Sequence, residues 1–221
     1  MILAYETSTD ICSVAYQNVE GEIHEKRIQG RSVHSDHLFL FTQALMEKHG
    51  FAIDQIDNVL VSIGPGSYTG LRIAASAIKG IFFDSVANIY ATNTLAGIAA
   101  SQLEKSGKTV HAIIDARRSH VYHQQFHINK LMVPQSEMKL LEIDTFEATL
   151  TEADIVVGTG LNRLNPTNLE GIETSSTDVI SAQNLIQLFN HQSESEFFDK
   201  TDLEALDPNY ITSSQVNNSS V

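Results

Sequence analysis

Residues 63–73 read Ile63-Gly64-Pro65-Gly66-Ser67-Tyr68-Thr69-Gly70-Leu71-Arg72-Ile73. An apolar run at 59–63 leads into this stretch, and a helix-like run at 71–83 follows it. Because glycine has no Cβ, a Gly-rich turn between strand and helix can bring backbone N–H groups close to an anion or to another backbone segment. The loop alone therefore fits either a phosphate site or a purely structural turn.

The chain before and after this loop alternates between strand-like and helix-like segments. Strands are predicted at 2–5, 11–16 and 22–29, and their short connections imply antiparallel pairing. A helix should begin at Ser35 as N-cap and end before Gly50, and further elements should follow the loop as strand 89–92 and helix 95–105. This order indicates an α/β fold, a mixed sheet flanked by helices.

The second half repeats the pattern of the first. Strands are predicted at 110–114, 120–128, 138–143 and 154–157, and a helix at 182–190. Each half has an acid after its first strand (Glu6, Asp115) and a glycine turn after a later strand. We therefore predict two lobes, 1–106 and 107–221, with a disordered tail from about residue 212.

A duplicated fold with an acid in each hairpin turn resembles the actin-like, sugar-kinase-like superfamily (ASKHA, ribonuclease H-like). In that superfamily a nucleotide lies between the halves, and the hairpin turns hold its phosphates and metal. The resemblance implies a degenerate nucleotide site in this chain. Its residues would be Glu6, Thr7, Ser8, Gly64, Gly66 and Asp115.

Composition and charge exclude several classes of protein. The chain has 221 residues, 42% of them hydrophobic, and one cysteine, Cys12, so no internal disulfide can form. No apolar run reaches the roughly 18 residues of a membrane span, and the first residues lack the basic region of a signal peptide. We expect a cytoplasmic protein with no membrane contact. The net charge of −13 opposes direct tight binding to RNA by this chain alone.

The motifs also resemble one particular family. Residues 4–9, His34-Ser35, the long glycine motif at 64–73, residues 115–117 with Val121-Tyr122, and Pro208-Asn209-Tyr210 together look like the TsaB family, also called YeaZ. The resemblance extends over the chain to about Tyr210. Two departures are visible, because the family commonly has Asp where Glu6 stands and Leu-Arg where Ile211-Thr212 follow the tyrosine.

That resemblance implies a non-catalytic accessory subunit. It would pair with and support the catalytic subunit TsaD, together with the ATPase TsaE, while threonylcarbamoyl is transferred to the adenosine beside the tRNA anticodon. No cofactor would be required by this chain, although the full complex would use ATP and Mg. In isolation the chain would form a homodimer.

The partner surface is expected on two helices. Helix 71–83 carries apolar residues on two sides, and residues 38–41 form four apolar positions in a row, more than one core-facing stripe needs. A helix buried entirely within its own domain would also show this pattern. The predicted interface consists of Leu38, Phe39, Phe41, Ile73, Ser76, Ala77 and Gly80.

No catalytic or metal site is predicted. His34 and His37 lack a third ligand, and on one strand His120 faces away from His123 and His127, which lie about 13 Å apart. A partly exposed strand is the preferred interpretation of that histidine set. Ser67 does not lie in a hydrolase elbow.

Two enzymatic alternatives remain at this point. An independent ATP-dependent transferase or kinase of the actin-like superfamily would use Glu6, Asp115 and the glycine turns. A metallopeptidase-like hydrolase would rest only on distant kinship to TsaD, and the sequence offers no metal triad for it. ATP affinity and turnover of the isolated chain would separate a scaffold from an enzyme.

Overall fold

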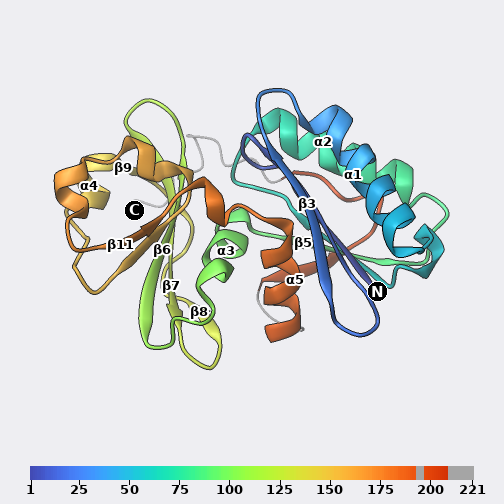
Figure 1. The fold of residues 1–221 in the computed structure, drawn as a ribbon. Helices are drawn as coiled ribbons and strands as arrows, with labels where there is room; N and C mark the ends of the chain where they lie inside the picture. Colours follow the sequence, from blue (N-terminus) through green and yellow to red (C-terminus); the bar gives the residue numbers. More distant parts are fainter. Residues whose placement is uncertain (193–196, 209–221) are drawn as a thin grey trace. The chain divides into compact units, whose positions relative to one another are not determined.

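The structure is a computed structural model that describes residues 1–192 and 197–208, drawn in Figure 1. Two compact units divide the chain. The first contains Met1–Gly97 and the return segment that begins at Ile180, and the second contains Ile98–Val179. The boundary therefore differs from the predicted 106/107 division, and part of the predicted second lobe belongs to the first unit.

A six-stranded mixed sheet forms the first unit, in the order β12-β5-β4-β1-β2-β3. β1, β2 and β3 are antiparallel, as their short connections predict, whereas β1, β4 and β5 are parallel. The strands are β1 (Ile2–Glu6), β2 (Ile11–Gln17), β3 (Ile23–Gln29), β4 (Asn58–Ser62), β5 (Asn88–Thr92) and β12 (Phe198–Thr201).

Helices cover both faces of this sheet. Leu3 and Tyr5 of β1 pack in one cluster with α1 (His34–His49) and α2 (Tyr68–Ile81). The alternate residues, Ile2 and Ala4, pack against α5 (Ala182–His191). Because both faces of β1 are apolar, the sheet needs a helix on each side, and α5 supplies the second one from far along the chain.

The second unit repeats this topology. Its sheet has the strand order β11-β10-β6-β7-β8, and β9 also pairs with β7. In this order two parallel pairs are followed by two antiparallel pairs, as in β5-β4-β1-β2-β3 of the first unit. The predicted duplication is confirmed. The elements are β6 (Lys108–Asp115), β7 (His120–Ile128), β8 (Met132–Pro134), β9 (Lys139–Glu142), α4 (Ile143–Glu147), β10 (Ile155–Val157) and β11 (Glu173–Ser175).

Helix ends differ from prediction in three places. The N-cap of α1 is Val33, two residues before the predicted Ser35, which lies inside the helix instead of capping it. α2 begins at Tyr68 because the Ser67 side chain accepts from Gly70 N–H and caps it. The predicted helix 95–105 is shorter, because α3 (Thr94–Ala99) ends at Ala99 and a 3-10 turn (Ala100–Gln102) follows.

Some predictions fall outside the described residues. Asn209 and Tyr210 of the C-terminal motif and the tail from about 212 are among them. Within residues 1–192 and 197–208, no helix combines the length and apolar character needed to cross a bilayer.

Candidate functional site

The glycine loop packs directly on the β1–β2 turn. The Ser67 N–H donates to the Ser8 carbonyl at 2.6 Å, and Thr7 Oγ1 donates to the Gly70 carbonyl at 2.9 Å. A Cβ on Gly66 would lie 2.2 Å from the Ser8 carbonyl oxygen, and Gly66 has a φ of +155°. One role of these glycines is therefore structural, because they allow the backbone of the loop to approach the backbone of the β1–β2 turn closely.

Glu6 lies at the centre of this contact, fully enclosed. Its carboxylate accepts from Ser8 N–H at 2.7 Å, from the Ser8 hydroxyl, and from Ser62 Oγ. Burial raises the pKa of the Glu6 carboxyl above its ordinary value, opposed by those hydrogen bonds and by the field of His34. The carboxylate is therefore directed inward at neighbouring hydroxyls.

The predicted nucleotide residues of the first unit do come together. Glu6, Thr7 and Ser8 face the loop that carries Gly64 and Gly66, and Thr7 and Ser8 are fully buried. The Thr7 and Ser8 hydroxyls already donate hydrogen bonds within this contact, to the Gly70 carbonyl and to the Glu6 carboxylate. Binding of a nucleotide there stays a prediction.

Asp115 has its own set of partners in the second unit. Its carboxylate accepts from the Arg117 N–H at 2.7 Å and pairs with the Arg163 guanidinium at 2.9 Å. Its N–H donates to Thr159 Oγ1 at 3.3 Å. Each unit thus engages its own acid internally.

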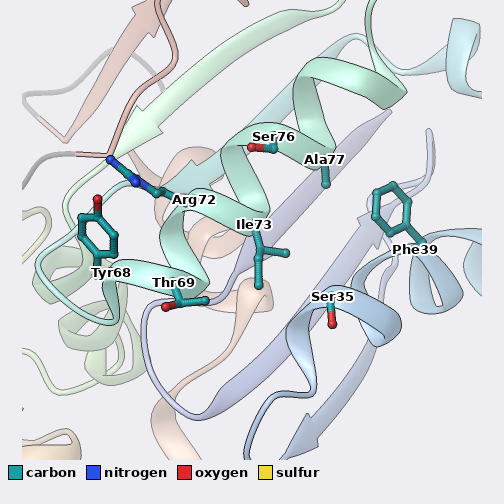
Figure 2. A pocket seen from close by; sticks show the side chains of 8 residues that line it. All are labelled: Ser35, Phe39, Tyr68, Thr69, Arg72, Ile73, Ser76 and Ala77. Carbon is teal, nitrogen blue, oxygen red and sulfur yellow. The ribbon is translucent and has the colours of Figure 1, made fainter.

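A groove of about 440 Å³ lies between α1 and α2. Figure 2 shows Phe39 of α1 on one side of it, with Ile73 and Ala77 of α2 opposite. Phe39 is 50% exposed, so half of its side chain is open to solvent at the groove. The lining residues are Ser35, Phe39, Tyr68, Thr69, Arg72, Ile73, Ser76 and Ala77.

The predicted interface is partly corrected by this geometry. Leu38 is completely buried and Ala77 is 3% exposed, so both belong to the core of the first unit. Phe41 and Ile73 are half-buried, packed against the same core. The exposed members are therefore Phe39, Ser76 and Gly80. Four apolar residues in a row encircle a helix, so only some of them can face outward.

The predicted interface omits four residues of the groove, Ser35 of α1 and three residues of α2. Tyr68, Thr69 and Arg72 lie in the first turns of α2, and the Arg72 guanidinium stacks 4.1 Å above the Tyr68 ring. The i, i+4 spacing of Tyr68 and Arg72 was the sequence signal that could have predicted their contact.

A second missed group lies in the second unit. His111 Nδ1 and His123 Nε2 are 3.0 Å apart, and both rings contact Phe146. β7 is partly exposed, as predicted, at His120 and His127, whereas His123 is buried. The signal lay in the lateral strand pairing, which the sequence alone does not give.

His34 and His37, which the sequence analysis also considered as ligands, have backbone partners. His34 Nε2 contacts the Thr9 carbonyl at 2.9 Å, and His37 Nδ1 contacts the Val33 carbonyl at 3.0 Å. In the described part of the chain, no group of three or more His, Cys, Asp or Glu side chains is arranged to hold a metal. Cys12 is buried in β2 as expected.

Comparisons with known proteins agree with this fold. The family model described as "TsaD: tRNA N6-adenosine threonylcarbamoyltransferase" matches residues 29–137. The solved structure "YeaZ from Pseudomonas aeruginosa" superposes with a TM-score of 0.79 at 25% identity, covering 95% of this chain and 99% of that one.

Curated relatives carry one name, "tRNA threonylcarbamoyladenosine biosynthesis protein TsaB". The Haemophilus influenzae protein is 30% identical over 125 residues, 56% of this chain and 52% of the relative. The Escherichia coli protein is 30% identical over 126 residues, 57% of this chain and 54% of the relative. The chain thus spans about half the length of the curated relatives it matches. The chain is thus similar to proteins of the TsaB family, also called YeaZ, in sequence over about half of its length and in fold over most of it.

Proposed function

We propose that this chain is a non-catalytic subunit of the complex that transfers threonylcarbamoyl to the adenosine next to the anticodon of tRNAs. The observation that carries this proposal is the open groove between α1 and α2. The two acids of the actin-like pattern support it, because each is already engaged within its own unit. The chain would pair with TsaD, act with TsaE, and form a homodimer in their absence. We place it in the cytoplasm, where tRNA is modified.

The proposed pairing surface combines small and large residues. Ser76 and Gly80 are small exposed residues four positions apart on α2, and Ser76 lines the same groove as the exposed Phe39 ring. A partner helix could approach these small residues closely and bury the aromatic ring, the usual anchor of an interface. The proposal therefore makes a prediction about side-chain size at these two positions.

Ser76→Arg and Gly80→Leu should each weaken pairing with TsaD by roughly thirtyfold, equivalent to about 2 kcal/mol. Both positions are exposed, and a Cβ at Gly80 meets nothing within 4 Å, so the fold should persist. Ser76→Ala and Gly80→Ala are the matched controls and should pair normally. Circular dichroism reports folding, and size-exclusion chromatography with purified TsaD reports pairing. If the folded large variants pair as the wild type does, the interface lies elsewhere.

The enzymatic alternative is not favoured. An actin-like transferase or kinase needs an acid free to hold magnesium waters, whereas Glu6 is buried against hydroxyls and Asp115 is paired with Arg163. We propose that the chain needs no cofactor of its own, and that ATP and Mg serve the full complex.

We expect the isolated chain to bind Mg-ATP weakly and to hydrolyse it at no measurable rate. Isothermal titration calorimetry and a phosphate-release assay test this directly. Glu6→Asp, which introduces the residue common in the family, is the matched variant, and we expect it to gain no turnover. Micromolar affinity with steady turnover in the wild-type chain would favour the enzyme over the scaffold.

A further inference from the structure

The turn between β6 and β7 has an unusual backbone. Arg117 and Arg118 have φ values of +68° and +52°. Residues other than glycine seldom adopt positive φ, and Asn, Asp and His are the residues most often found among the exceptions. The backbone therefore does not account for two arginines at this position.

Side chains of the second unit hold the turn in place. Asp115 accepts from the Arg117 N–H at 2.7 Å, and Arg163 binds both the Asp115 carboxylate and the Arg118 carbonyl. Arg163 thereby neutralises the acid that lies closest in sequence to the turn. The positive-φ conformation is thus held by two charged side chains, Asp115 and Arg163.

The turn also carries two solvent-exposed guanidinium groups, those of Arg117 and Arg118. Arg117 and Arg118 are exposed, and neither side chain forms an ion pair within residues 1–192 and 197–208. The sequence has a single other adjacent cationic pair, Lys26-Arg27, in β3. There the two side chains point to opposite faces, and Arg27 Nε donates to the Ile180 carbonyl. The tip is therefore a local positive point on a chain of net charge −13.

We propose that the 116–119 tip contacts the phosphate backbone of RNA in the assembled complex. This inference rests on the proposed function. Guanidinium groups bind phosphate oxygens through paired N–H donors, and neighbouring arginines can reach successive phosphates of a strand. The Ala116 and Arg117 N–H groups are already bonded to the His120 carbonyl and to Asp115. The turn therefore offers a phosphate the side chains of two arginines and no free N–H group at Ala116 or Arg117. We infer from this that it binds an extended polyanion in preference to a single nucleotide.

The test measures tRNA binding by the full chain, alone in low salt and in complex with TsaD, as a function of salt concentration. Arg117→Gly/Arg118→Gly removes both charges, and glycine tolerates the positive φ, so the turn should survive. Lys108→Gln/Lys130→Gln removes two charges from exposed positions at the opposite end of the same two strands, and serves as the matched control.

We expect the arginine variant to reduce the slope of log K against log salt by about 1.4 to 1.8, the value for two lost phosphate contacts. The control should keep the wild-type slope. Equal slopes for both double variants, or no measurable binding by the wild-type chain in low salt, would overturn the inference. So would loss of ATP affinity with unchanged RNA binding, which would identify a nucleotide-phosphate site. Failure of the wild type to pair with TsaD contradicts the proposed function, while the low-salt titration still decides the inference.

Discussion

Gly70→Ala should destabilise the protein by about 3 kcal/mol or more, near the upper end of single-substitution effects. An added Cβ would lie 2.0 Å from the Thr7 carbonyl oxygen and 3.1 Å from His34 Cδ2. The carbonyl belongs to a buried turn between two central strands, so it cannot move without disturbing β1 and β2. The hydrogen bond from Thr7 Oγ1 to the Gly70 carbonyl would also be strained.

Chemical denaturation followed by circular dichroism measures this loss. Gly80→Ala is the matched control in the same helix, because its Cβ meets nothing within 4 Å. That control should be more stable than the wild type by about 0.5–1 kcal/mol, since alanine is the better helix former. Wild-type stability of Gly70→Ala would mean that the loop and the turn are less tightly packed than the structure indicates.

The same glycine loop shows how far the sequence alone could lead. The glycines Gly66 and Gly70 indicated that another group comes close to the loop backbone. The flanking apolar runs predicted β4 and α2 correctly apart from their ends. The sequence left open what approaches the glycines, because an anion and a backbone carbonyl require the same missing Cβ. The structure places the Ser8 and Thr7 carbonyls there.

Non-local packing explains what was mispredicted. α5 has a clear amphipathic pattern, but the sequence does not say which sheet it covers. Its position in the sequence predicts that it belongs to the second lobe, whereas in the structure it packs against β1 of the first unit. Leu38 and Phe39 are adjacent and equally apolar, yet one is buried and the other exposed. Rotation of a helix about its axis depends on the partner sheet, and this information is absent from a run of apolar residues.

The paired histidines of the second unit are a further non-local contact, and they predict a strong dependence of stability on pH. His111 on β6 and His123 on β7 are diagonal neighbours across the ladder, since His123 is registered with Ile113. Burial lowers the pKa of His123 to about 3, and the charges of His111 and Lys139 act in the same direction. Burial also lowers the pKa of His111, although Asp154, 3.7 Å away, opposes this.

Both imidazoles are therefore neutral in the folded state at pH values where the unfolded chain takes up protons. A histidine with an ordinary pKa of 6.5 begins to bind a proton below that value once it is unfolded, so stability falls as pH decreases from about 6.5 towards 3. For His123 alone, the loss between pH 7.5 and pH 5 should be about 2 kcal/mol.

His123→Gln should flatten this dependence, because glutamine does not titrate, while its amide can still bond to His111 Nδ1. His127→Gln, on the same strand and only partly buried, is the matched control. Denaturation curves at pH 7.5, 6 and 5 provide the measurement. A reduced pH slope in the His123 variant alone would assign proton uptake to the buried pair. An unchanged slope in that variant would show that acid acts on the protein elsewhere.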